Sequence, residues 1–153
     1  MNGSKTGKTG VEPVESEAAR EDAFAVREAV FVNEQGVPEE LEWDEHDDAV
    51  GTLQFVAYDG GEPVGAARLR RVDDDDGVRK VERVAVLEAE RGNGWGKRLV
   101  EALERAASDG GVRELRLHAQ THVETFYRDL GYETTSDVFE EAGIPHVEMW
   151  KSL

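Results

Sequence analysis

The sequence predicts an α/β domain with a mixed β-sheet. Two long stretches, residues 17–32 and 94–107, carry apolar side chains at helical spacing. Shorter stretches between and after them alternate apolar and polar residues, as strands do when one face is buried. The predicted order is a helix, three strands, a helix, a strand, a short helix and two final strands, which favours an α/β fold. With 153 residues, the chain has room for one such domain and little more.

The first half of the chain begins with a polar stretch that leads into the first helix. Residues 1–12 open with a run of glycine, serine, threonine and lysine, which predicts a disordered tail before a domain at 13–153. Ser16 is a suitable N-cap for the helix that follows. The other elements predicted here are an irregular acidic loop at 33–48, with room for one short helix, a strand at 52–58, a hairpin turn at 59–61 and a strand at 63–72.

The second half begins with an acidic turn at 73–77 and a strand at 78–86 whose residues alternate strictly. This period of two predicts that Glu82, Val84 and Val86 share one face of the strand. The remaining predicted elements are the helix at 94–107, a strand at 114–119, a short helix at 123–130 and two strands at 132–135 and 146–150.

The composition is strongly acidic, with 34 Asp and Glu against 18 Lys and Arg and a net charge of −16. A surface of this kind repels nucleic acid, so we expect no nucleic-acid partner. The charge is compatible with disorder, but the regular apolar pattern favours a folded protein adapted to high salt. Charge repulsion is screened within about 3 Å at 1 M salt, and the scarcity of lysine resembles proteins of extreme halophiles.

Cysteine is absent from the sequence, which excludes disulfides and thiolate catalysis and fits a cytoplasmic protein. The chain has no run of 18 apolar residues and no signal-like apolar segment near its start. We therefore expect neither a membrane span nor a secretory signal. The sequence leaves the oligomeric state open, and a homodimer is compatible with it.

The strongest indication of function in the sequence is a glycine-rich turn between a strand and a helix. Gly92, Gly94 and Gly96 would let the backbone approach a ligand and direct its N–H groups to one point. The helix that follows adds partial positive charge at its N-terminus, and such a site binds phosphate. Residues 91–99 contain three basic residues and no acid, which in so acidic a chain indicates an anionic ligand.

These residues resemble the GNAT N-acetyltransferase superfamily. The stretch Arg91-Gly92-Asn93-Gly94-Trp95-Gly96-Lys97 looks like that family's loop for the pyrophosphate of acetyl-CoA. A second stretch resembles another signature of the family, with Tyr132 where the family has phenylalanine. This stretch is Phe126-Tyr127-Arg128-Asp129-Leu130-Gly131-Tyr132. Two further motifs, Glu34-Gln35-Gly36-Val37-Pro38 and Gly143-Ile144-Pro145-His146, look like the ElaA-like branch of the superfamily.

The resemblance implies a mixed, mostly antiparallel central sheet flanked by helices. It also implies direct transfer of an acetyl group from acetyl-CoA, as co-substrate, to a primary amine. The strand before the loop would pair with the pantetheine arm, and the loop would bind the pyrophosphate. The cofactor-binding residues implied in this way are Val84, Ala85, Val86, Arg91, Gly92, Asn93, Gly94, Trp95, Gly96 and Lys97.

Two residues are the leading candidates for catalysis. Tyr127 resembles the tyrosine with which the family protonates the departing thiolate, although a core aromatic with a satisfied hydroxyl is the alternative. Glu82 is the candidate base, because its predicted face looks toward the reacting end of the cofactor. Glu34 and His118 are rival bases. Glu34 and Gln35, by resemblance, and His118 are also the candidate substrate-binding residues.

Other functions remain open at the level of sequence. The chain could be a non-catalytic acyl-CoA-binding module, an acyltransferase for longer acyl chains, or an interaction protein without CoA affinity. The acceptor could be a polyamine, an amino sugar, an antibiotic, an amino acid or a protein N-terminus. The spacing of the four histidines matches no zinc motif, so we expect no metal.

Overall fold

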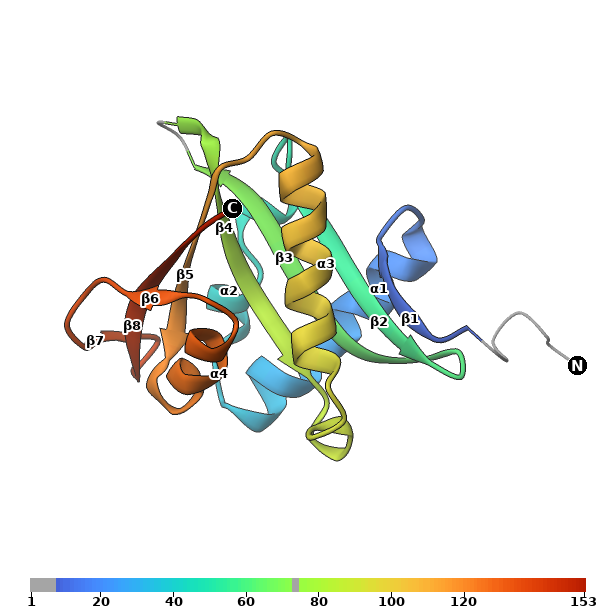
Figure 1. Ribbon diagram of the computed structural model, residues 1–153. Coiled ribbons are helices and arrows are strands. Elements are labelled where there is room, and N and C mark those ends of the chain that lie inside the picture. Colours follow the sequence, from blue (N-terminus) through green and yellow to red (C-terminus); the bar gives the residue numbers. More distant parts are fainter. Residues whose placement is uncertain (1–7, 73–74) are drawn as a thin grey trace, which may run out of the picture.

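The computed structural model describes residues 8–72 and 75–153, and within them eight strands form one mixed sheet (Figure 1). The sheet order is β1-β2-β3-β4-β5-β8-β6, with β7 paired to β8 outside this path. All strand pairs are antiparallel except β4 with β5. The strands are β1 Gly10–Pro13, β2 Leu53–Asp59, β3 Glu62–Val72, β4 Asp75–Val86, β5 Glu114–Gln120, β6 Glu133–Thr134, β7 Phe139–Glu141 and β8 Ile144–Ser152.

Helical segments cover both faces of this sheet (Figure 1). One face of the sheet packs against α3, whose Leu99 and Leu103 are fully buried in a cluster with Val81 of β4 and Leu117 of β5. The other face packs against α1 through a second apolar cluster that includes Val26. The helical segments are α1 Glu17–Arg27, η1 Glu28–Glu34, α2 Glu39–Glu42, η2 Glu45–Asp48, η3 Glu88–Glu90, α3 Trp95–Asp109, η4 Thr121–Val123 and α4 Glu124–Asp129. The mixed, mostly antiparallel sheet flanked by helices confirms the predicted fold class.

Local sequence signals explain several element boundaries. The Ser16 hydroxyl accepts a hydrogen bond from the Ala19 N–H at 3.1 Å, so it caps α1 as predicted. The predicted turn at Gly60 and Gly61 joins β2 to β3, and both glycines have the positive φ that such a turn requires. The first helix continues from α1 into η1, a π-helix whose wider turns carry the chain to Glu34.

The predicted tail needs a correction. Residues 10–13 form strand β1, which pairs antiparallel with β2, and the Lys8 carbonyl accepts from the Gly61 N–H at 2.8 Å. Tertiary pairing with an open sheet edge therefore fixes a segment whose composition alone favours disorder. The rest of the predicted tail, residues 1–7, lies outside the described residues. The predicted acidic turn also changes, because β4 already begins at Asp75.

Candidate functional site

Strands β4 and β5 separate part way along their length. Their parallel pairing runs from Val78 opposite Glu114 to Val81 opposite Leu117, and it stops there. Beyond that point β4 continues to Val86 paired with β3, and β5 continues to Gln120 paired with β8. Among the described strands, the two edges that face each other across the opening therefore have no strand partner. Unpaired backbone N–H and C=O groups at such an opening are available to a ligand.

A β-bulge at Arg83 accompanies this separation. Arg83 has φ 56°, and the register of β4 against β3 shifts between Glu82 and Ala85. The extra residue turns Val84 and Val86 toward the α3 side, while Glu82 stays on the opposite side with Ala85. The prediction that Glu82 shares a face with Val84 and Val86 was therefore wrong, because strict alternation does not survive a bulge.

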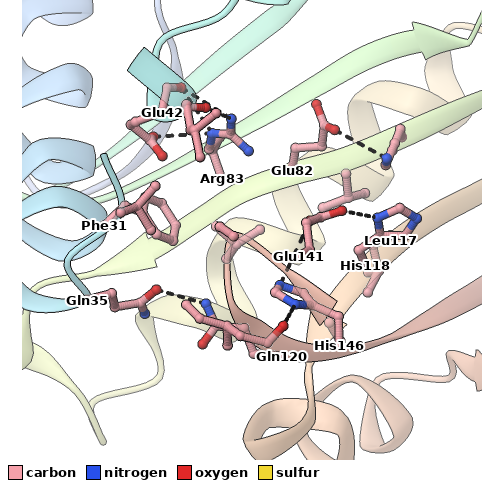
Figure 2. Close-up of a pocket in the computed structure, with 18 of the residues that line it drawn as sticks. Phe31, Gln35, Glu42, Glu82, Arg83, Leu117, His118, Gln120, Glu141 and His146 are labelled. Carbon is pink, nitrogen blue, oxygen red and sulfur yellow. Dashed lines mark hydrogen bonds and ion pairs between the residues drawn. The ribbon is translucent and has the colours of Figure 1, made fainter. Parts of the chain in front are cut away.

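A pocket of about 410 Å³ lies next to the opening (Figure 2). Side chains from many parts of the chain line it, among them η1, β4, β5, α4 and the β7–β8 hairpin. They include Phe31, Gln35, Glu82, His118, Tyr127 and His146. Gln120 donates to the Gln35 side-chain oxygen at 2.8 Å and so ties η1 to the end of β5 across this pocket. Three of the predicted residues, Gln35, Glu82 and His118, are thus brought together with Tyr127.

Tyr127 lies on α4 and is 7% exposed. Its ring packs edge-on against Phe126 and Tyr132, at centroid distances of 5.0 and 5.7 Å. The hydroxyl has no hydrogen-bond partner among the described residues, whereas the Tyr132 hydroxyl donates to Glu104 at 2.9 Å. Burial raises the pKa of Tyr127 above that of an ordinary tyrosine, and the phenol is protonated at neutral pH. This environment differs from that of a core tyrosine with a satisfied hydroxyl.

Glu82 is held by cations rather than left free. One of its carboxylate oxygens accepts from Arg68 at 2.5 Å and from Arg70 at 2.7 Å, and Lys80 lies 3.5 Å from the other. Burial alone would raise the pKa of Glu82, but Arg68 and Arg70 outweigh it and lower the pKa to about 2. A carboxylate of such low pKa is a weak proton acceptor near neutral pH.

The glycine-rich loop leads into the N-terminus of α3. Gly92 and Gly94 have φ of 86° and 87°, and a Cβ at either position would meet no atom within 4 Å, so this backbone is open. Gly96 serves packing instead, because a Cβ there would lie 3.2 Å from the Phe126 ring. The first turn of α3 contains no acid and has no side-chain cap, which leaves its N–H groups available.

The side chains of this segment divide between core and surface. Trp95, the first residue of α3, is buried in the core, and the Arg98 guanidinium lies 4.3 Å from the centre of its ring. Trp95 would therefore meet a ligand through its backbone. Asn93 and Lys97 are exposed. The loop and the N-terminus of α3 lie at the same end of the sheet as α4 (Figure 1). An anion bound at this helix end would therefore lie near the element that carries Tyr127.

Arg91 makes contacts that its sequence position did not predict. It donates to both oxygens of Glu34 at 2.7 Å and to the Val86 carbonyl at 3.0 Å. Arg91, which we expected at the cofactor, and Glu34, which we expected at the acceptor, thus form a bidentate ion pair. This hydrogen bond to Arg91 lowers the pKa of Glu34.

Sequence reasoning missed the role of the β7–β8 hairpin. Glu141 lies 2.8 Å from His118, and His146 faces the same carboxylate (Figure 2). His146 belonged to a quoted motif but had no assigned role, and no spacing signal in a chain with 34 acids singles out Glu141. Among residues 8–72 and 75–153, no group of acidic and histidine side chains is arranged to hold a metal. No helix in these ranges is long and apolar enough to cross a membrane.

Comparison with known proteins shows which families and chains this protein is similar to. Residues 13–153 match the family model described as an acetyltransferase (GNAT) domain. The uncharacterized N-acetyltransferase YjcF of Bacillus subtilis (strain 168) is 46% identical over 137 residues, or 89% of this chain and 94% of YjcF. Protein ElaA of Escherichia coli (strain K12) is 34% identical over 130 residues, or 84% of each chain. The crystal structure of Escherichia coli ElaA is similar, with a TM-score of 0.84, 28% identity, and coverage of 94% of this chain and 99% of ElaA.

Proposed function

Because this chain belongs to the ElaA-like branch of the GNAT acetyltransferase family, we propose that it transfers an acetyl group from acetyl-CoA to a primary amine. The observation that carries the proposal is the position of Tyr127, with its free hydroxyl at a pocket where β4 and β5 separate. A thioester carbonyl held between the strands would lie within reach of both an acceptor in the pocket and this phenol.

The donor site is proposed along β4 and the loop that follows it. The edge of Val84, Ala85 and Val86 that faces away from β3 offers backbone groups to the amides of the pantetheine arm, and the Val86 carbonyl there already accepts from Arg91. Open backbone at Gly92 and Gly94, together with the uncapped N-terminus of α3, suits the pyrophosphate. Lys97, in the first turn of α3, adds positive charge at that position.

The transfer itself needs no covalent enzyme intermediate. The amine lone pair attacks the thioester carbonyl carbon, the C–N bond forms, and the C–S bond breaks. The departing thiolate takes the proton of the Tyr127 hydroxyl, which is protonated at neutral pH. Gln35 and Gln120, joined across the pocket, would help to enclose the acceptor.

A screen of thiol release tests this function. Purified protein is mixed with acetyl-CoA and each of a panel of primary amines, at low salt and in molar KCl, and CoA thiol is measured. We expect thiol release that depends on one class of amine, and a product whose mass has increased by one acetyl group. Binding of CoA without turnover of any amine would favour a non-catalytic acyl-CoA module. The same screen is repeated with octanoyl-CoA in place of acetyl-CoA. Faster release of CoA thiol from octanoyl-CoA would favour a longer acyl donor.

A further inference from the structure

Glu141, near the end of β7, lies between two imidazole rings at the edge of the pocket (Figure 2). One carboxylate oxygen is 2.8 Å from Nδ1 of His118 on β5. The other is 3.9 Å from Nε2 of His146 on β8, which is too far for a direct hydrogen bond. Glu141 therefore makes a direct hydrogen bond with His118, whereas a gap separates it from Nε2 of His146.

The tautomer of His146 follows from its other nitrogen. Nδ1 lies 2.7 Å from the carbonyl oxygen of Ile144, and a carbonyl oxygen only accepts, so Nδ1 carries the hydrogen. In the neutral ring Nε2 then holds a lone pair. The ring is 7% exposed and stacks on Phe139, with 6.1 Å between centroids and 22° between planes. His146 is therefore a fixed ring whose lone pair faces the gap beside Glu141.

We propose that Glu141 and His146 bind the primary ammonium group of the acceptor, and that His146 removes its proton. This inference rests on the proposed acetyl transfer and names the acceptor group and its base. A nitrogen that donates to two acceptors lies about 2.9 Å from each of them. One nitrogen can lie at that distance from two acceptors 3.9 Å apart, so one ammonium group can reach both Glu141 Oε2 and His146 Nε2.

The charges around the gap suit a cation. The hydrogen bond from His118 is the main influence that lowers the pKa of Glu141, so the carboxylate is ionised at neutral pH. Two further charged groups lie close to this cluster: Lys80 of β4, whose charge acts on Glu141, and Glu148 of β8, 3.8 Å from Nε2 of His118. His122, on the neighbouring η4, is exposed and does not line the pocket. An ionised carboxylate between two imidazoles thus meets the incoming positive charge.

The proton transfers balance in this arrangement. The ammonium N–H bond breaks and its proton moves to Nε2 of His146, which becomes an imidazolium beside Glu141. The freed lone pair forms the C–N bond, and the thiolate that leaves takes a proton from Tyr127. A second proton leaves the nitrogen as the amide forms and restores the phenol through solvent, while His146 returns its own proton to solvent.

The structure favours His146 over Glu82 as the base. Glu82 has a pKa of about 2 and makes hydrogen bonds to Arg68 and Arg70, so it has little tendency to take a proton. His118 already uses Nδ1 to bind Glu141, and its Nε2 faces Glu148. His146 is the member of this group whose free lone pair faces the gap.

Two measurements with n-butylamine as the probe test the proposal. The first follows the ring ¹⁵N resonances of His146 at pH 8 as n-butylammonium chloride is added. We expect Nε2 to shift with the probe and not with equal NaCl, and the shift to disappear in Glu141→Gln. Resonances of His146 that do not move would overturn the ammonium site.

The second measurement is kcat/KM for acetyl transfer to n-butylamine against pH, for wild type, His146→Asn and His122→Asn. Asparagine can still donate to the Ile144 carbonyl but cannot act as base. We expect a loss of at least about 100-fold at pH 7 in His146→Asn that shrinks as pH rises and the free amine appears. His122→Asn should match wild type.

The outcomes separate this inference from the proposed function. A His146→Asn profile that equals wild type at every pH would overturn the base while thiol release supports acetyl transfer. A loss that stays constant with pH would also overturn the base, because a positioning defect is not relieved by free amine. A shift of His146 with the probe but no thiol release in wild type would overturn acetyl transfer and still support the ammonium site.

Discussion

Arg91 holds both carboxylate oxygens of Glu34 at 2.7 Å, and this pair joins the loop before α3 to the π-helix that lines the pocket. If the pyrophosphate of the donor binds this loop, it competes with Glu34 for the same guanidinium. Donor binding would then loosen the contact between the loop and η1, which carries Phe31, a pocket residue. This ion pair would then couple the donor side of the proposed active site to its acceptor side.

Replacing Glu34 with Gln should tighten CoA binding, because it removes the competitor for Arg91. Exposed ion pairs of this kind contribute about 0.2–1 kcal/mol, so we expect a gain in affinity of roughly 1.5- to 5-fold by calorimetry. Asp75→Asn removes a comparable exposed pair with Arg113 and should leave CoA affinity unchanged. Weaker CoA binding in Glu34→Gln would mean that the pair organises the loop rather than competes with the ligand.

Replacing Gly94 with Val should abolish most CoA affinity, because a branched side chain would fill the open backbone at the start of α3. Gly111→Val is the matched control at the other end of that helix. Both glycines have positive φ, 87° and 82°, and a Cβ at either would meet nothing within 4 Å, so the backbone strain is similar. Equal CoA affinity in the two variants, measured by calorimetry, would place the pyrophosphate elsewhere.

The sequence predicted those elements whose cause is local. Ser16 caps α1 through a bond three residues away, and the turn at Gly60 and Gly61 depends on their backbone freedom. Strand β1 was missed because pairing with β2, about 45 positions away, decides it. The bulge at Arg83 was missed because a non-glycine residue at φ 56° has no local signature.

The candidate site likewise contains some residues that local sequence signals predicted and others that only the folded chain brings together. A glycine pattern and a tyrosine motif pointed to the loop and to Tyr127. The cation cluster around Glu82 could not be read from the sequence, since Arg68 and Arg70 reach it across a strand pair. Glu141 and His146 come together only through the β7–β8 hairpin.

Glu82 should stabilise the fold in a pH-dependent way. Its pKa falls from 4.5 to about 2 on folding, so its contribution is present above pH 4.5 and is lost as pH falls toward 2. Glu82→Gln should therefore lower the free energy of unfolding at pH 7 by on the order of 3 kcal/mol, and the difference from wild type should vanish near pH 2. A difference that stays constant from pH 7 to pH 2, in urea titrations, would contradict an ionic role.

Salt should stabilise this protein, because its 34 acidic residues repel one another until they are screened. We expect the melting temperature to rise by at least about 5 °C between 0.05 M and about 2 M KCl, which corresponds to ~2 kcal/mol for a chain of this size. Sorbitol at matched osmolality provides the uncharged control. A flat or falling melting temperature in KCl would count against adaptation to high salt.

The most direct test of acetyl transfer at this site is kcat for Tyr127→Phe, measured beside the dissociation constant for CoA. The variant keeps the aromatic ring, so its packing against Phe126 should be preserved. The dissociation constant for CoA should stay within about 3-fold of the wild-type value. Loss of the proton donor should lower kcat at least about 10-fold, allowing for partial replacement by water. Tyr132→Phe, which removes a hydroxyl bonded to Glu104, should leave kcat unchanged. Wild-type turnover in Tyr127→Phe, or a joint loss of rate and CoA affinity, would contradict the role assigned to this hydroxyl.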